Sequence, residues 1–263
     1  MLTFLAIAFF IFGIIIGSFS NVVIYRLPNN LSIVKPRSAC PKCHKEIKWY
    51  DNIPILSYVL LKGKCRECHE KIPFRYPLVE GIMGIMYLLA FLWFGLQPLL
   101  AFYIIFITIG IIIIFIDLSE MIIPDSLNLS ILILGFAHLV FVFINDGFEE
   151  TISHLLGMVF GFGLLLLVRR LGFVFYKREA LGFGDVKLMG ASGLFLGLGL
   201  TLLSFLIASI TGAIIETILM KTKVRKKHAE IPFGPYLILG MLISLFFGDM
   251  IISWYFGFFW EMN

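Results

Sequence analysis

Long apolar runs, separated by short polar segments, make up most of this chain. A helix needs about 20 apolar residues to cross the hydrocarbon core of a bilayer. The run over residues 186–199 is the shortest and is rich in glycine. The pattern predicts an all-α fold, a polytopic membrane bundle of about eight transmembrane helices. The expected spans are roughly 4–25, 78–95, 99–117, 127–145, 152–171, 186–199, 201–220 and 233–256.

The composition agrees with a chain that has lipid as its solvent. Of its 263 residues, 60% are hydrophobic and only 14% are charged, and the mean hydropathy is +0.98. A soluble domain carries roughly 25% charged residues. The net charge of +4 is small, and the basic residues are confined to a few loops. We therefore expect a lipid bilayer as partner and no nucleic acid.

The distribution of basic residues predicts the orientation of the spans. The first of the 21 Lys and Arg residues is Arg26, and 11 of them lie from Arg26 to Arg75. The other ten follow the fifth and seventh spans or open the sixth. Loops with an excess of Lys and Arg stay in the cytoplasm. We therefore expect the N-terminus outside and all the basic residues on the cytoplasmic side.

All four cysteines lie in the first of these loops, over residues 26–77, which we call the cysteine loop. They form two Cys-x-x-Cys pairs that are separated by 21 residues. Two such pairs favour a structural, tetrahedral zinc site, because four thiolates leave no position open for water. The zinc would also supply folding energy to a loop with little apolar content. A redox pair, disulfides and four unliganded thiols are the alternatives. The expected ligands are Cys40, Cys43, Cys65 and Cys68.

Two acidic residues at the ends of predicted spans are candidates for catalysis. Asp117 follows the apolar run 111–116, and Asp185 follows Gly182-Phe-Gly184. An ionisable group at a membrane span indicates a functional site by default. In the predicted topology both acids lie at the same depth on the cytoplasmic face. Two carboxyls that share one proton can act as acid and base of an aspartyl protease. The glycines are expected to allow positive φ and close approach of a substrate strand.

Purely structural roles for these and other charged residues stay open as alternatives. A lone Gly-x-Gly-Asp is also typical of a helix start with Asp as the N-cap. Asp125, which follows Pro124, is expected to cap the fourth span. Glu80 is placed at the opening of the second span, where an acid suits the helix dipole. Lys187 is either an anchor at the membrane interface or a charge near the aspartate pair.

Taken together, these segments resemble the type IV prepilin peptidases, the membrane aspartyl proteases of the Gly-x-Gly-Asp type. The resemblance covers nearly the whole chain. One departure is Ser20, where a larger apolar residue is expected. The matching segments are 17–28, the paired Cys-x-x-Cys loop, 52–57, 75–80, 117–125, 182–187 and 231–235.

The resemblance implies an activity and a division of the chain. It implies that Asp117 and Asp185 are catalytic, and that Gly182, Gly184, Asp125 and Lys187 belong to the supporting motif. The substrates would be prepilins or pseudopilins, cut after a Gly at the cytoplasmic face of the bacterial inner membrane. It also implies N-methylation of the new terminus with S-adenosylmethionine. The regions would be 1–98 for methyl transfer and 99–263 for the peptidase.

Several points stay open at this stage. Glu80 is a methyl-transfer candidate on resemblance only, and no motif indicates where the methyl donor binds. The resemblance does not separate adhesion pili, competence fibres and secretion apparatus as destinations of the substrates. Rival interpretations are an enzyme with peptidase activity alone, a presenilin-like intramembrane protease, and a transporter with a structural zinc loop. Transporters place binding acids near the midplane of the membrane, whereas these two acids are expected at one face.

Overall fold

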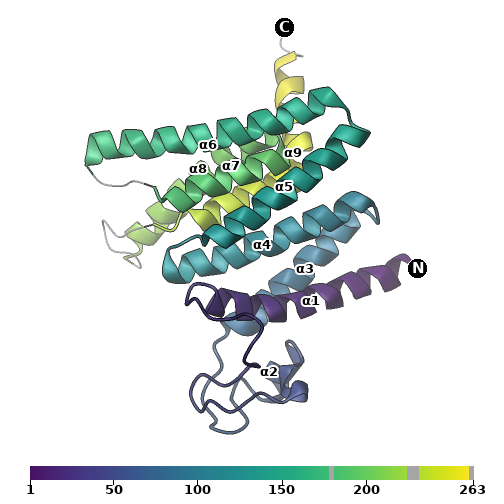
Figure 1. Cartoon of the computed structure of the whole chain (residues 1–263), viewed down its shortest axis with the longest axis vertical. Helices are drawn as coiled ribbons and strands as arrows, with labels where there is room; N and C mark the ends of the chain where they lie inside the picture. Colours follow the sequence, from purple (N-terminus) through teal and green to yellow (C-terminus); the bar gives the residue numbers. More distant parts are fainter. Residues whose placement is uncertain (178–180, 224–230, 261–263) are drawn as a thin grey trace. The chain divides into compact units, whose positions relative to one another are not determined.

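A computed structural model describes residues 1–177, 181–223 and 231–260 of the chain. Its elements are helices, and no strand occurs within the described ranges. The fold divides into two compact units, Met1–Ile112 and Ile113–Asn263. Helix α4 (Pro98–Glu120) begins in the first unit and ends in the second. The two units are therefore treated in turn (Figure 1).

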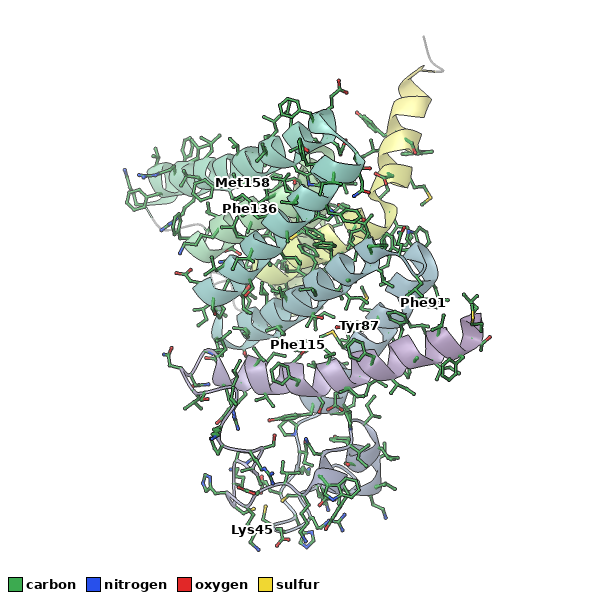
Figure 2. All side chains as sticks on the ribbon, turned by 45° about the vertical axis from the view of Figure 1, so that its right-hand side comes forward. Lys45, Tyr87, Phe91, Phe115, Phe136 and Met158 are labelled. Carbon is green, nitrogen blue, oxygen red and sulfur yellow. The ribbon has the colours of Figure 1, made fainter. Side chains whose placement is uncertain are left out.

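The first unit is built on the close packing of α1 (Leu2–Arg26) against α3 (Arg75–Phe94). A Cβ atom at Gly13 would lie 2.7 Å from the carbonyl oxygen of Met83, so the two backbones nearly touch there. Small residues drive such packing in membranes, where lipid supplies no hydrophobic force between helices. Figure 2 shows Tyr87 and Phe91 of α3, and Phe91 stacks on Phe9 of α1 at 4.7 Å between ring centroids.

The cysteine loop joins α1 to α3. It contains a 3-10 turn, η1 (Trp49–Asn52), and a short helix, α2 (Leu56–Leu60). Each Cys-x-x-Cys pair forms a tight turn that ends in a histidine with positive φ, 58° at His44 and 56° at His69. The two turns repeat one hydrogen-bond pattern, in which the histidine N–H donates to the carbonyl of the first cysteine, Cys40 or Cys65.

The second unit is a helical bundle around a short central helix, α7 (Phe183–Leu196). Every residue of α7 from Asp185 to Leu196 is buried except Lys187. Helix α7 packs against all four of the other helices that lie wholly in this unit (Figure 1). They are α5 (Asp125–Asn145), α6 (Phe148–Tyr176), α8 (Leu198–Lys221) and α9 (Gly234–Trp260).

Glycine lets these helices approach one another. A Cβ at Gly157 of α6 would meet the carbonyl oxygen of Gly193 of α7 at 2.5 Å. Gly197 alone separates α7 from α8, and its φ of +82° is a conformation that residues with a side chain rarely adopt. The chain therefore reverses within one residue, and this keeps α7 short.

The predicted spans correspond to eight observed helices, with ends that differ by a few residues. One difference concerns α7, which has 14 residues and is therefore about 21 Å long, too short to cross about 30 Å of hydrocarbon. Among the described residues, seven helices are long and apolar enough to span a membrane. These seven are α1, α3, α4, α5, α6, α8 and α9.

Candidate active site and metal centre

Asp117 lies in the last turn of α4 and is 5% exposed. Its Oδ2 accepts a hydrogen bond of 3.0 Å from the backbone N–H of Gly234, the first residue of α9. A helix N-terminus carries partial positive charge and stabilises an anion. A Cβ at Gly234 would lie 2.7 Å from the same carboxylate oxygen and would displace it. The start of α9 therefore holds Asp117 in this position through a glycine.

Asp185 is the third residue of α7 and is 8% exposed. Its Oδ2 lies beside Gly182, where a Cβ would be 3.1 Å away. Its Oδ1 is buried and has no hydrogen-bond partner among the described residues. A buried carboxylate oxygen without a partner is costly, and it is available to a bound molecule. Asp185 therefore has a buried oxygen that no described residue engages.

The structure brings the two predicted aspartates together within the second unit. Asp185 interacts electrostatically with Asp117. Ile123 lies between their supports, since Cβ atoms at Gly184 and at Gly234 would meet it at 3.1 and 3.2 Å. Asn128 of α5 adds a hydrogen bond of 3.3 Å to the Gly184 carbonyl. The pair is thus assembled from α4, α7 and α9, with one isoleucine as a common spacer.

The predicted reason for the glycines before Asp185 is wrong. Gly182 has φ −66° and ψ 147°, an extended conformation that any residue adopts, and Gly184 is not among the residues with positive φ. Gly184 is instead required by its close contact with Ile123, and Gly182 by the proximity of the Asp185 carboxylate. These glycines are needed for space, not for backbone conformation.

The capping role expected of Asp125 is also wrong. The N-cap of α5 is Pro124, Asp125 is the first helical residue, and no side-chain cap bond forms. Instead the Asp125 carboxylate binds the Lys187 ammonium at 2.7 Å, which ties the first turn of α5 to the first turn of α7. Lys187 is therefore neutralised by Asp125, which is 75% exposed, rather than directed at the buried aspartates.

Glu80 differs from its predicted place at the opening of a helix. Helix α3 begins at Arg75, so Glu80 lies in its second turn, and it is 7% exposed. Its Oε2 accepts a hydrogen bond of 2.7 Å from the N–H of Ile55, and its carboxylate also interacts with Ser18. Ile55 has φ +59°, which is unfavourable for a β-branched residue. Glu80 therefore holds the turn that precedes α2.

The four cysteines form the one cluster of possible metal ligands within the described residues. Their sulfur atoms all lie within 4.8 Å of one another, and the Sγ atoms of Cys40 and Cys68 are 3.8 Å apart. Tetrahedral zinc with Zn–S bonds of about 2.3 Å requires sulfurs separated by about 3.8 Å. The cluster therefore has the spacing of a tetrahedral tetrathiolate site.

The thiols influence one another strongly in this cluster. Burial raises the pKa of Cys40, but backbone hydrogen bonds at Cys43 and Lys42 and the neighbouring thiols lower it, to about 7 overall. A backbone hydrogen bond at Glu70 lowers the pKa of Cys68, but burial and the other thiols raise it, to about 12 overall. Adjacent thiols thus retain protons that a divalent cation would displace.

Two ion pairs support the cluster from outside. Lys45 of the first Cys-x-x-Cys turn binds Glu67 of the second at 2.6 Å, and Figure 2 places Lys45 at the tip of the loop. Arg66 binds Asp51 of η1 through two hydrogen bonds of 2.8 and 2.6 Å. These pairs connect the two turns to each other and to η1.

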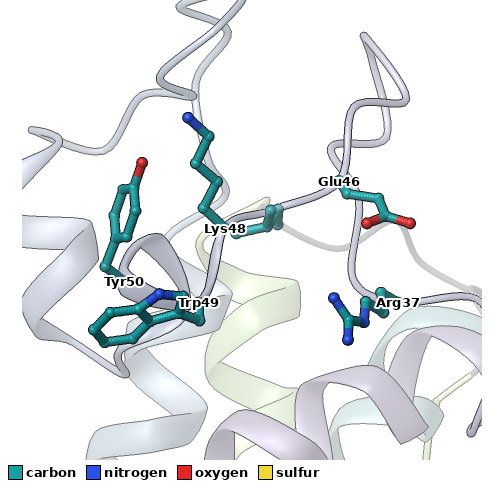
Figure 3. A pocket seen from close by; sticks show the side chains of 6 residues that line it. Arg37, Glu46, Lys48, Trp49 and Tyr50 are labelled. Carbon is teal, nitrogen blue, oxygen red and sulfur yellow. The ribbon is translucent and has the colours of Figure 1, made fainter.

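A cavity of about 280 Å³ lies in the same loop. Figure 3 shows Trp49 and Tyr50 on one side of it and Arg37 and Glu46 on the other. Glu80, the candidate for methyl transfer, does not line this cavity. The contacts of Glu80 therefore indicate a role in shaping the loop's attachment to α3, separate from this exposed hollow.

Comparison with known proteins identifies the family. A family model described as "Type IV leader peptidase family" matches residues 104–216, and one described as "Bacterial Peptidase A24 N-terminal domain" matches residues 11–94. A Legionella pneumophila protein named prepilin leader peptidase/N-methyltransferase is 34% identical, over 94% of this chain and 93% of its own length. The chain belongs to the type IV leader peptidase family.

Other relatives extend this result. Proteins of the same name from Pseudomonas aeruginosa and Bacillus subtilis are 33% and 32% identical, each over 94% of this chain and over 91% and 96% of their own lengths. No solved structure is significantly similar. The two family models together cover the segment with the cysteines and the segment with the two aspartates.

Sequence reasoning missed two features of this leader peptidase. The N–H of Gly234 supports Asp117 from 117 positions away, and Tyr236 donates a hydrogen bond of 2.7 Å to the buried Glu216. The signal that pointed to the first is the segment 231–235, which contributed to the resemblance without a physical role assigned to it. The structure gives it one: it begins α9 beside Asp117.

Proposed function

We propose that this protein removes the short basic leader of type IV prepilins and pseudopilins, cutting after a Gly at the cytoplasmic face, and then N-methylates the new terminus. The buried pair of Asp117 and Asp185 is the observation that carries the peptidase half of this proposal. The names of the relatives support both halves. The destinations of the processed pilins would be adhesion pili, competence fibres or a secretion apparatus.

The proposed mechanism is general acid–base catalysis by two carboxyls. One carboxylate removes a proton from a water molecule, which attacks the scissile carbonyl, while the other carboxyl donates a proton to the carbonyl oxygen. When the C–N bond breaks, the proton taken from water passes to the leaving amine. Asp185 is suited to contact water or substrate, because its Oδ1 has no partner among the described residues. Asp117 is fixed by the N–H of Gly234. Gly182, Gly184, Asp125 and Lys187 position the start of α7.

The proposed location is a bacterial inner membrane, with the aspartates facing the cytoplasm and the N-terminus outside. The support is the charge pattern, because this orientation puts all 21 Lys and Arg residues on one side. The cysteine loop then also lies in the cytosol, a compartment that keeps thiols reduced.

The cysteine cluster is proposed to hold one structural zinc ion, with Cys40, Cys43, Cys65 and Cys68 as ligands. The fit rests on the spacing of the sulfur atoms. We expect the purified protein to contain about one zinc per chain by elemental analysis, and Cys65→Ser to lose the metal and to expose the loop to trypsin. A Ser126→Ala variant, exposed and outside the loop, is the control. Metal-free protein with a trypsin-resistant loop would contradict the zinc assignment.

Methyl transfer is proposed for residues 1–98 and cleavage for residues 99–263. S-adenosylmethionine would supply the methyl group. Glu80 stays a candidate on resemblance alone, and its contacts with Ile55 and Ser18 support a role in shaping this region. The first unit would therefore contribute the fold around the methyl donor rather than residues of the aspartate pair.

The test is reconstitution of the purified protein with a prepilin, followed by intact-mass analysis of the product. We expect loss of the leader and gain of one methyl group with the wild-type protein. Asp117→Asn and Asp185→Asn should abolish cleavage while membrane insertion is retained. Asp249→Asn is the matched control, since Asp249 is an exposed acid of α9 that has no part in the proposed site. Full cleavage by Asp185→Asn would contradict the proposed mechanism.

A further inference from the structure

A second hollow, of about 330 Å³, lies between α8 and α9. Apart from Glu216 and Thr217, the side chains that form its walls are apolar or aromatic. Its walls include Gly212, Glu216 and Met220 of α8, with Ile231, Phe233 and Tyr236 on the other side.

This hollow shares a wall with the proposed catalytic pair. Phe233 lines it, and the next residue, Gly234, donates its N–H to Asp117. Tyr236 lines it as well, and its own N–H donates to the Phe233 carbonyl at 3.1 Å, within the first turn of α9. The wall and the support of Asp117 are therefore one short, hydrogen-bonded segment. A displacement of this wall would be transmitted to the carboxylate.

The shape of the hollow depends on the hydrogen-bonded side chains of Tyr236 and Glu216. The Tyr236 ring lies over Gly212, where a Cβ would be 3.4 Å from the ring carbons. The Tyr236 hydroxyl donates to Glu216 Oε1 at 2.7 Å, and Glu216 is 4% exposed. A buried acid in a membrane helix is expensive and requires a purpose. Here Glu216 fixes the phenol, and the small residue at 212 leaves room for the ring to form a flat wall.

We propose that this hollow binds an apolar side chain of the substrate that lies within two residues of the scissile peptide bond. The inference rests on the proposed function, because it requires Asp117 to mark the site of cleavage. An extended peptide advances about 3.3 Å per residue, so only residues adjacent to the cut reach a wall that begins one residue from the Asp117 support. The apolar lining selects an aliphatic or aromatic side chain, with Glu216 and Tyr236 as positioning residues.

The test changes the size of the hollow and the size of the substrate side chain together. Ala213 is exposed and lines the hollow, so Ala213→Phe should reduce its volume, and Met220→Ala should enlarge it. Ile214→Phe adds an aromatic ring at the neighbouring position, which does not line the hollow and is 55% exposed, and serves as the control. The substrates are prepilins that keep the Gly before the cut and carry Phe, Leu or Ala at the first or the second position after it.

We expect Ala213→Phe to lower kcat/KM by about tenfold or more for substrates with a large apolar side chain at one of these positions. Cleavage of the Ala substrate should be unchanged, and Met220→Ala should shift the preference towards larger side chains. Glu216→Gln, which can still accept from Tyr236, should retain the preference for size, whereas Glu216→Ala should lose it through a higher KM. A size preference that is retained in Glu216→Gln and lost in Glu216→Ala would show that Glu216 positions Tyr236 and does not merely stabilise the fold.

Two results would overturn the inference. Equal effects of Ala213→Phe on all substrates would show that the hollow does not hold a substrate side chain. An effect that follows the acyl chains of the reconstituting lipid, and not the substrate, would show that lipid fills it. A failure of the proposed function is distinguishable from both, because it would appear as no prepilin cleavage by the wild-type protein or as cleavage that survives Asp117→Asn.

Discussion

Glu80 of the first unit and Asp185 of the second are buried to nearly the same degree, 7% and 8% exposed, yet their surroundings differ. Glu80 accepts a hydrogen bond from the backbone N–H of Ile55 and interacts with Ser18. Asp185 lies beside a second carboxyl, that of Asp117, and one of its oxygens has no partner within the described residues. Two acids that are equally buried can therefore differ in how fully their oxygens are hydrogen-bonded.

The difference lies in what remains available to a bound molecule. A carboxylate whose oxygens already accept hydrogen bonds lowers the free energy of the fold and offers little to a substrate. A carboxylate that is buried without partners raises that free energy, and its surroundings must hold it in place. In this protein the packing of α7 among four helices and the N–H of Gly234 supply that support. Each prediction below changes one side of this comparison.

The largest effect is expected from removing the charge of each acid in turn. Asp185→Asn should lower the rate of prepilin cleavage by about 10²- to 10⁴-fold, the usual contribution of a general acid or base. Glu80→Gln should leave the rate of cleavage nearly unchanged, because the amide oxygen still accepts from Ile55. Cleavage of a prepilin in proteoliposomes measures both. Comparable losses of activity in the two variants would remove the distinction between the two sites.

A smaller effect is expected from disturbing the support of Asp117. In Gly234→Ala the new Cβ would lie 2.7 Å from Asp117 Oδ2, so the carboxylate must move. A misplacement of this order costs about 10- to 100-fold in rate, and kcat should fall more than KM changes. The control is Gly163→Ala, also in the second unit, where an added Cβ would meet nothing within 4 Å. Equal activity of the two variants would disprove the supporting role of Gly234.

The third effect concerns stability rather than catalysis. Glu80→Ala leaves the buried N–H of Ile55 without its acceptor, which should cost about 1–3 kcal/mol. Asp185→Asn should leave the free energy of unfolding unchanged or slightly higher, because it removes a poorly partnered buried charge. Thermal unfolding in detergent, with trypsin cleavage of the cysteine loop as a local readout, compares the two variants. A larger loss of stability in Asp185→Asn than in Glu80→Ala would contradict the comparison.

The smallest effect is expected at Asp51, a third carboxylate, which is paired near the surface. Two hydrogen bonds from the Arg66 guanidinium hold the pKa of Asp51 below its usual value of 3.8. Because the pKa is lowered in the fold, the pair stabilises the loop above about pH 4 and loses this effect as the pH falls below that value. At pH 7, Asp51→Asn should raise amide exchange in η1 by no more than about fivefold.

This prediction has its own control in the second ion pair of the loop. Glu67→Gln breaks the pair with Lys45, in which Lys45 is 65% and Glu67 39% exposed, and should have an even smaller effect than Asp51→Asn. Exchange that is unchanged in Asp51→Asn but raised in Glu67→Gln would reverse the expected order. The comparison would then depend on the position of a pair within the loop and not on its burial.

The sequence predicted those parts of this molecule that depend on local periodicity and composition. The apolar runs located the helices, and two Cys-x-x-Cys pairs indicated four sulfur atoms around one point, as the structure confirms. The charge pattern predicted one depth for Asp117 and Asp185, which stays a prediction, and the structure brings the two acids together. These features need no knowledge of which helices pack against one another.

The features that escaped prediction all depend on tertiary packing. Asp125 has the sequence context of a helix cap, but its partner is Lys187, 62 positions away. Glu80 was placed at the start of a helix, because nothing local shows that α3 begins at Arg75. The glycines before Asp185 suggested positive φ, and only the positions of Ile123 and of the Asp185 carboxylate show that space is limited at Gly184 and Gly182. Local sequence patterns do not predict which distant residues are joined by such contacts.

The single-residue turn at Gly197 has a consequence for where a peptide can be cut. Asp185 is the third of the 14 residues of α7, so it is about 18 Å from the turn along the helix axis. When the turn lies at one boundary of a hydrocarbon layer about 30 Å thick, this residue lies about 12 Å short of the other boundary. In that placement, the depth of Asp185 in the bilayer depends on the difference between the length of α7 and the thickness of the hydrocarbon layer. If the two acids cut the substrate as proposed, the scissile bond would have to lie beneath the headgroups to meet them, and anchorage of the substrate in the bilayer would then select the bond to be cut.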